Sequence, residues 1–107
     1  MPEVQVQAFA AAHADGAFVL DVREPHEYVA GHVPGSLLIP VGELPARVRD
    51  LPRDARIYVI CASGNRSRVM TDLLTRNGFD AHSVQGGTGE WVRSGHRVVV
   101  GPHPNAP

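Results

Sequence analysis

Short apolar runs alternate with helical patterns along this 107-residue chain, and Gly or Pro separates most of them. Runs of a few apolar residues suit strands that are buried on both faces of a sheet. When a helix follows each strand, it brings the chain back to the end of the sheet where that strand began. The next strand then runs parallel to the first, with a right-handed crossover. The alternation therefore predicts an α/β fold: a small parallel sheet of about four to five strands with helices on both faces.

The local patterns place the individual elements. The expected strands cover residues 17–20, 37–39, 57–60 and 82–84. Amphipathic spacing predicts helices over residues 6–13, 44–51, 66–77 and 87–94. Between the first two strands, prolines and glycines leave room for about one helical turn.

The end of the chain is harder to assign to an element. Residues 98–100 fit either a last short strand or a packed extension. Residues 101–107 hold three prolines, which predict a flexible C-terminal tail. We therefore expect one domain over residues 1–100, followed by that tail.

Charge and hydropathy exclude several classes of partner. Ten basic residues, all of them Arg, and eleven acidic ones leave a net charge of −1. Without a global basic field, neither nucleic acid nor a membrane surface is expected as a partner. The longest apolar run, residues 57–62, is far shorter than the roughly 18 residues of a membrane span. The N-terminal residues lack the features of a secretory signal, so we expect a cytoplasmic protein.

Cys61 is the one cysteine of the chain. An internal disulfide and a multi-cysteine zinc site are therefore excluded, and the six His residues are too scattered to predict another metal site. The absence of Lys excludes Schiff-base chemistry. We expect no metal and no cofactor, so any chemistry is that of a single thiol.

Cys61 directly follows the strand predicted over residues 57–60, and the sequence CASGNR leads from it into the next helix. Ligands of parallel sheets bind at these carboxyl ends of strands. Backbone N–H groups of such a loop surround the sulfur, and Gly64 and Asn65 tolerate the tight turn that this requires. An inert buried thiol is the alternative interpretation of a lone cysteine.

Typical interaction energies indicate how much stabilisation of the Cys61 thiolate this loop has to supply. Lowering the pKa of a thiol by two units requires about 2.7 kcal/mol of preference for the anion. A helix dipole contributes only about 0.3–1 kcal/mol, whereas one or two charge-assisted hydrogen bonds at about 1.5–3 kcal/mol each close the difference. Arg66 either adds a cationic contribution or points outward.

The motif CASGNRS, the upstream LDVREPHEYVAGHVPGS and the downstream GGTGEW jointly resemble the rhodanese (sulfurtransferase) family, over roughly residues 3–100. The resemblance implies that the cysteine takes sulfur from a donor such as thiosulfate or a persulfide, carries it as a persulfide, and passes it to a thiol, to cyanide or to a protein acceptor. It places the nucleophile at Cys61 and the persulfide cradle at Ala62, Ser63, Gly64, Asn65, Arg66 and Ser67.

Four further residues are supporting candidates. Asp21 and Arg23 follow a predicted strand, and a salt bridge that braces the Cys61 loop is favoured over direct catalysis. His32 lies between Gly and Pro, which favours a turn-locking side chain over an acid–base role. Trp91 is expected to pack in the core beneath the last helix rather than to form a pocket wall. Whether Asp21, Arg23 and Arg66 contact substrate stays open.

Two departures and two alternatives limit the interpretation. Rhodaneses specialised for thiosulfate tend to carry basic side chains where this chain has Ser63 and Glu27, which leaves the donor open. Phosphatases and arsenate reductases of related type place five residues between Cys and Arg, whereas this chain has four, which argues against that class. An idle or regulatory module that binds a partner is the other alternative, and the presence of Cys61 argues against it.

Overall fold

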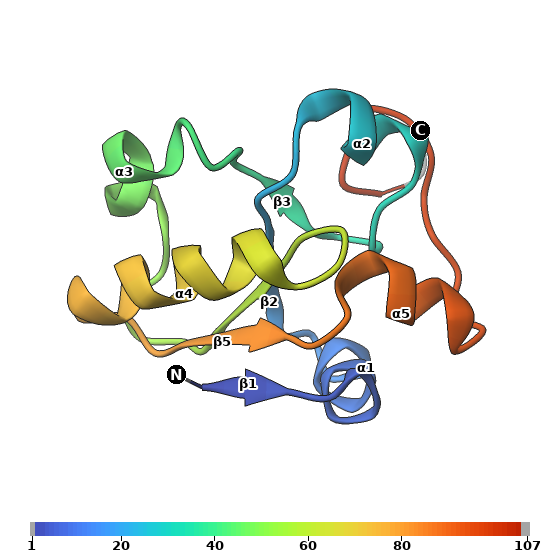
Figure 1. Cartoon of the computed structure of the whole chain (residues 1–107), viewed down its shortest axis with the longest axis horizontal. Coiled ribbons are helices and arrows are strands. Elements are labelled where there is room, and N and C mark those ends of the chain that lie inside the picture. Colours follow the sequence, from blue (N-terminus) through green and yellow to red (C-terminus); the bar gives the residue numbers. More distant parts are fainter. Residues whose placement is uncertain (1, 106–107) are drawn as a thin grey trace.

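A computed structural model describes residues 2–105 of the chain and shows a five-stranded parallel sheet in the order β1-β5-β4-β2-β3 (Figure 1). The strands are β1 (Glu3–Val4), β2 (Phe18–Asp21), β3 (Leu37–Leu38), β4 (Ile57–Ile60) and β5 (Ala81–Val84). β4 pairs with β2 and β5, so the strand with the strongest apolar pattern is central and wholly buried. The predicted α/β fold with a parallel sheet is confirmed.

Helices cover both faces of the sheet, and alternate residues of β4 pack against each layer. Ile57 and Val59 lie in the core beneath α4 (Asn65–Arg76) and the short α3 (Leu44–Arg47). Tyr58 and Ile60 face the other layer, formed by α1 (Val6–Ala14) and α5 (Gly87–Arg93). A further short helix, α2 (Pro25–Ala30), begins with the proline-led turn expected between the first two strands.

Two elements differ from the sequence-based expectation, and the structure decides between the two alternatives for residues 98–100. β1 was not predicted, because two residues are too few to show alternation; it is held by parallel pairing with Ser83 and Val84 of β5. The expected helix over residues 44–51 breaks at Arg47, whose φ of −120° is not helical, and continues as a 3₁₀ turn over Val48–Asp50. Residues 98–100 form a packed extension, in which Val99 makes one antiparallel bridge to His32.

The described part of the C-terminal tail contacts the segment that follows α2. Gly35 donates its backbone N–H to the carbonyl of Pro104 at 2.8 Å, and a ring nitrogen of His32 lies 2.8 Å from the carbonyl of His103. The boundary at residue 100 and the flexibility of the tail stay predictions. None of the helices within residues 2–105 is both long enough and apolar enough to cross a membrane.

Thr71 lies on the buried side of α4, and its hydroxyl has no hydrogen-bond partner among the described residues. Replacing this hydroxyl by a methyl group removes a desolvation cost and keeps the side-chain shape. We expect Thr71→Val to raise the free energy of unfolding by about 1 kcal/mol, measured by chemical denaturation.

Thr75→Val is the matched control for this prediction. Its hydroxyl, one turn further along α4, donates to the carbonyl of Thr71 at 2.8 Å. This variant is expected to be no more stable than wild type. Equal destabilisation by both substitutions would contradict the interpretation that the Thr71 hydroxyl is unpaired.

Candidate active site

Cys61 lies at the carboxyl end of β4, where the chain turns into the loop that leads to α4. Its exposed fraction is 1%, so the thiol lies on the floor of this loop rather than at the surface. Gly64, immediately before α4, has a φ of +107°. A residue with a side chain rarely adopts this left-handed conformation, which explains why glycine occupies the turn.

Several donors of the loop converge on the Cys61 sulfur. The backbone N–H groups of Gly64 and Ser67 donate to Sγ at 3.1 and 3.3 Å, and the Ser67 hydroxyl oxygen lies 3.5 Å from it. Burial by itself raises the pKa of the thiol. The hydrogen bonds from the Ser67 hydroxyl and from the amides of Ser67, Gly64 and Ser63 outweigh this, and the pKa of Cys61 is lowered from its ordinary value.

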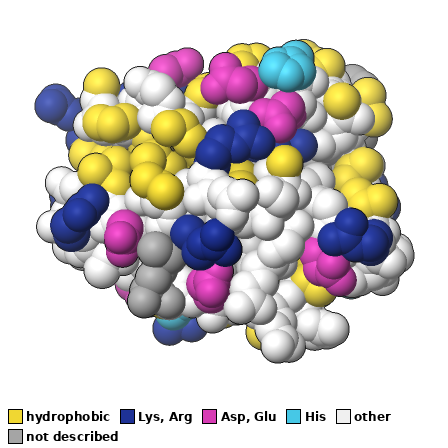
Figure 2. Space-filling view, in the orientation of Figure 1, with side chains coloured by type: hydrophobic (Ala, Val, Ile, Leu, Met, Phe, Trp, Pro, Cys, Tyr) yellow, Lys and Arg dark blue, Asp and Glu magenta, His cyan; other side chains and the backbone are white. Residues whose placement is uncertain are grey.

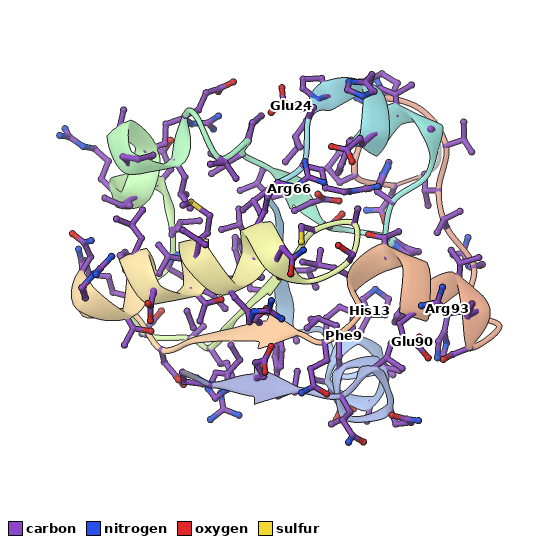
Figure 3. The ribbon with its side chains drawn as sticks, viewed as in Figure 1. Phe9, His13, Glu24, Arg66, Glu90 and Arg93 are labelled. Atoms are coloured by element: carbon purple, nitrogen blue, oxygen red, sulfur yellow. The ribbon has the colours of Figure 1, made fainter. Side chains whose placement is uncertain are left out.

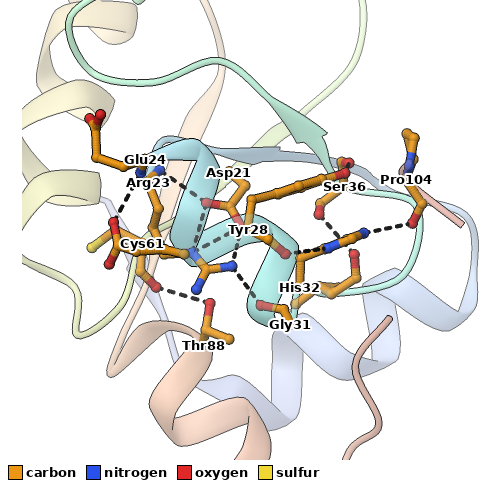
Figure 4. Close-up of polar contacts among 12 residues, drawn as sticks. Asp21, Arg23, Glu24, Tyr28, Gly31, His32, Ser36, Cys61, Thr88 and Pro104 are labelled. Carbon is orange, nitrogen blue, oxygen red and sulfur yellow. Dashed lines mark hydrogen bonds and ion pairs between the residues drawn. The ribbon is translucent and has the colours of Figure 1, made fainter. Parts of the chain in front are cut away.

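The first turn of α5 holds the carbonyl groups of the same loop. Thr88 donates its backbone N–H to the Cys61 carbonyl at 2.8 Å and its hydroxyl to the same oxygen at 3.2 Å (Figure 4). Gly89 donates its N–H to the Ala62 carbonyl at 3.0 Å. Because the Ala62 carbonyl points toward α5, the N–H of the same peptide unit, that of Ser63, points the other way, and it is one of the donors that lower the pKa of Cys61.

Gly87 is the closest point of approach between α5 and the Cys61 loop. Its φ is +57°, and a Cβ atom there would overlap the carbonyl oxygen of Cys61 and the carbonyl group of Ala62. These are backbone atoms, which cannot move aside as the end of a flexible side chain can. This clash explains why a glycine occupies the second position of the motif GGTGEW.

We expect Gly87→Ala to destabilise the fold by roughly 3 kcal/mol and to displace the Cys61 loop, because strain and a backbone clash act together. Thermal unfolding and the alkylation rate of Cys61 would measure the two effects. Gly95→Ala is the matched control, since Gly95 has a φ of +89° but no atom within 4 Å of the added Cβ. Equal losses in the two variants would show that backbone strain alone matters.

The side chain of Arg66, labelled in Figure 3, forms an ion pair with Glu27 of α2, so its positive charge is not free. The two guanidinium nitrogens Nη1 and Nη2 donate to the two carboxylate oxygens at 2.7 and 2.9 Å. Both side chains are partly exposed, at 38% and 24%. The sequence left open whether Arg66 adds a cationic contribution at the sulfur or points outward, and the structure instead places its guanidinium in an ion pair with the Glu27 carboxylate.

The hydrogen bonds from Arg66 hold the pKa of Glu27 at about 2, against an ordinary value of 4.5. A depressed carboxylate pKa adds stability above the unfolded pKa, and this is lost as pH falls through the folded value. We expect wild type to lose about 1 kcal/mol of stability from this pair between about pH 5 and pH 2, because partial exposure screens it.

Glu27→Gln is expected to lack this component of the acid profile and to match wild type near pH 2. Chemical denaturation at several pH values measures it, and 1 M NaCl should reduce the difference at pH 7. An unchanged profile in Glu27→Gln would mean that the ion pair contributes nothing to folding.

Asp21 and Arg23 form the predicted salt bridge at the end of β2 (Figure 4). The Arg23 Nε and Nη2 groups donate to the Asp21 carboxylate at 2.9–3.1 Å, and both side chains are nearly inaccessible. Nη2 also donates to the carbonyl of Gly31 at 2.8 Å. The pair thus ties β2 to the end of α2, and its role as a brace for the Cys61 loop stays a prediction.

His32 and Trp91 are both buried, in different parts of the molecule. The ring of His32 stacks on Tyr28 at 3.6 Å between centroids, and its nitrogens contact the carbonyls of Tyr28 and His103. Trp91 packs against Phe9, with Nε1 donating to the carbonyl of Arg97. These contacts are consistent with the expected turn-locking role of His32 and core-packing role of Trp91, and both roles stay predictions.

A family model of the rhodanese-like domain matches residues 5–94. The chain belongs to this family. A rhodanese-related protein from Thermoplasma volcanium has a crystal structure that matches this domain with a TM-score of 0.87 and 34% identity, over 92% of this chain and 97% of that one. A thiosulfate sulfurtransferase from Pseudomonas aeruginosa matches with a TM-score of 0.85 and 27% identity, over 99% of this chain and 21% of that one.

A curated relative of this rhodanese-like domain is the Bacillus subtilis protein named "Putative sulfur carrier protein YrkF". The two are 38% identical over 81 residues, which cover 74% of this chain and 44% of the relative. The chain therefore spans less than half the length of that protein.

Sequence reasoning on this rhodanese-like domain missed two contributors to the site. Thr88 was not singled out, because its contact with Cys61 joins segments 27 residues apart. Ser83 was also missed, although a Ser within a buried strand is a visible signal; its hydroxyl oxygen lies 2.7 Å from that of Ser67. Buried polar residues usually have a partner, so Ser83 could have been sought out on that ground.

An apolar recess of about 340 Å³ adjoins the loop of this rhodanese-like domain, lined by Val41, Asn65, Arg66, Val69 and Met70. Figure 2 shows hydrophobic side chains gathered on this face. A larger recess of about 670 Å³ is lined by residues such as Gly16 and Arg56, which precede β2 and β4. It therefore lies at the amino-terminal ends of the strands, whereas Cys61 lies at their carboxyl ends. Within the described residues, no group of three His, Cys, Asp or Glu side chains is placed to hold a metal ion.

Proposed function

We propose that this rhodanese-like domain is a sulfurtransferase that carries sulfur on Cys61 as a persulfide. The observation that carries the proposal is the set of neutral polar groups around one buried sulfur: two backbone amides that donate to it at 3.1 and 3.3 Å, and one hydroxyl whose oxygen lies 3.5 Å away. This arrangement favours an anionic sulfur without a metal or a cofactor. Membership of the rhodanese-like family and the relative named as a sulfur carrier support the same role.

In the first step, the Cys61 thiolate attacks the outer sulfur of the donor. A bond forms between Sγ and that sulfur while the sulfur–sulfur bond of the donor breaks. The remainder of the donor leaves with the bonding electron pair, as a thiolate from a persulfide or as sulfite from thiosulfate. Cys61 then holds a persulfide, whose terminal sulfur is the anion that the loop amides receive.

In the second step, a thiolate or cyanide attacks the terminal sulfur of the persulfide. The bond to Sγ breaks, and its electron pair returns to Cys61 as thiolate. Because Cys61 is the one cysteine of the chain, no second thiol within it can form a disulfide and release the sulfur. The acceptor therefore comes from outside this chain, as a small thiol, cyanide or a cysteine of another protein in the cytoplasm.

The ion pair between Arg66 and Glu27 supports a persulfide donor over thiosulfate. Thiosulfate is a dianion, and Glu27 neutralises the cation of the loop and holds a carboxylate beside it. Ser63, the other position where a basic residue would assist, is exposed and uncharged. The same pair argues against phosphatase or arsenate reductase chemistry, which needs a loop cation free to bind an oxyanion.

We expect the purified protein to gain one sulfur atom after incubation with glutathione persulfide, and to lose it on treatment with dithiothreitol. Intact-mass spectrometry after desalting measures both changes. Loading by thiosulfate at equal concentration should be at least tenfold slower, because the cation of the loop is paired with Glu27 and is not free to bind the dianion.

Cys61→Ser is the control, since it removes the nucleophile and nearly preserves its volume in the core. No gain of sulfur by wild type from either donor, together with binding to a partner protein, would replace this proposal with the idle-module alternative. A sulfur gain that persists in Cys61→Ser would show that another site carries it.

A further inference from the structure

A chain of two serine hydroxyls leads from the Cys61 sulfur into the sheet. The Ser67 oxygen lies 3.5 Å from Sγ, and the Ser83 oxygen of β5 lies 2.7 Å from that of Ser67. Both serines have an exposed fraction of 0%, so water does not compete for their protons. The direction in which each hydroxyl donates is therefore decided by the protein atoms around it.

Ser67 has one hydroxyl proton and three neighbouring polar atoms. Its oxygen also lies 3.1 Å from the carbonyl of Gly64, to which the hydroxyl can donate. While Cys61 is a thiol, its S–H can donate to Ser67, and the Ser67 proton can go to Gly64. When Cys61 is a thiolate, the S–H donor is lost, and the Ser67 proton stabilises the anion only by turning to Sγ.

Which serine donates to the other follows from the number of hydroxyl protons and of acceptors available to them. The structure shows no partner for the Ser83 hydroxyl other than Ser67 within the described residues. If Ser67 donated to Ser83, the Ser83 proton would be buried without an acceptor, and Ser67 would have no proton left for Sγ. Donation from Ser83 to Ser67 gives every hydroxyl proton an acceptor in both states of the thiol.

Turning the Ser67 proton away from Gly64 leaves no unpaired carbonyl. Gly64 O also accepts the backbone N–H of Arg68 at 3.2 Å. The change is therefore a rotation of one hydroxyl group within a fixed frame. No proton is transferred along the chain, because Ser67 and Ser83 each keep their own.

We propose that Ser83 is a positioning residue: its hydroxyl donates to the Ser67 oxygen and so directs the Ser67 proton to the Cys61 thiolate. The proposal deepens the function proposed above, since it rests on Cys61 as the nucleophile. A hydroxyl that accepts a hydrogen bond is a stronger donor to its own acceptor, and the sulfur is an anion both before attack and as a leaving group. Ser83 thus assists the loading and the discharge of sulfur without touching either substrate.

The test is the pH dependence of Cys61 alkylation by iodoacetamide, which reports the thiol pKa in the absence of any sulfur donor. We expect Ser83→Ala to raise the midpoint of this profile by about 0.5–1 pH unit, the effect of one neutral hydrogen bond. Ser83→Thr keeps the hydroxyl and should restore most of the shift. Thr71→Val removes a buried hydroxyl that has no partner, and should leave the midpoint unchanged.

A double-mutant cycle separates positioning from packing. If Ser83 acts through Ser67, Ser83→Ala should have little effect on the midpoint in a Ser67→Ala background. Should Ser83→Ala not fold, Ser83→Thr and Ser83→Val provide the comparison, since they share a shape and differ by one hydroxyl. An unchanged midpoint of the alkylation profile in the variant without the hydroxyl would overturn the proposal. A lowered midpoint would also overturn it, because it would show that Ser83 competes for the Ser67 proton.

Sulfur loading by mass spectrometry distinguishes this failure from failure of the proposed function. If wild type loads sulfur but the alkylation profile does not depend on Ser83, only the role of Ser83 is wrong. If wild type does not load sulfur, the proposed transfer is wrong whatever the profile shows. If wild type loads sulfur and the alkylation profile does depend on Ser83, discharge of the persulfide to dithiothreitol should be several-fold slower in Ser83→Ala. The reason is that Cys61 is then a poorer leaving group.

Discussion

The site depends on the direction of two carbonyl groups, those of Cys61 and Ala62. They accept hydrogen bonds from the first turn of α5, which holds the start of the loop in place, and the amide of Ser63, next in the chain, is one of the donors that lower the pKa of Cys61. This contact requires α5 to approach the loop at Gly87, where a side chain would not fit. Trp91, buried in the core, anchors the same helix. The first two residues of the loop are thus held by a helix that begins 26 residues after the cysteine.

The electrostatics of the loop rely on neutral donors. The hydrogen bonds that lower the pKa of Cys61 come from amides and one hydroxyl, while the guanidinium of Arg66 is engaged by Glu27. Dipoles held in a fixed direction stabilise a small anion at close range and attract distant anions only weakly. The proposed preference for one sulfur atom over a large, highly charged oxyanion rests on this arrangement.

Local patterns in the sequence were sufficient for the central part of the fold. The apolar run of β4, the turn residues that follow it and the face of α4 predicted the loop and the position of Cys61 at its start. Contacts between distant segments could not be predicted in this way. The orientation of Arg66 depends on Glu27, 39 residues earlier, and the two-residue β1 exists only because β5 pairs with it. No periodicity in either segment encodes these partners.

The sheet ends on both sides in strands of only two residues, β1 and β3. A long unpaired edge invites another chain to add a strand, which leads to fibres or domain swapping. Here each edge offers a very short row of free backbone groups, so self-association through the sheet is disfavoured. The matched domains in the Pseudomonas aeruginosa and Bacillus subtilis relatives are parts of longer chains. Blunt edges would let such a unit sit beside other domains without fusing to their sheets.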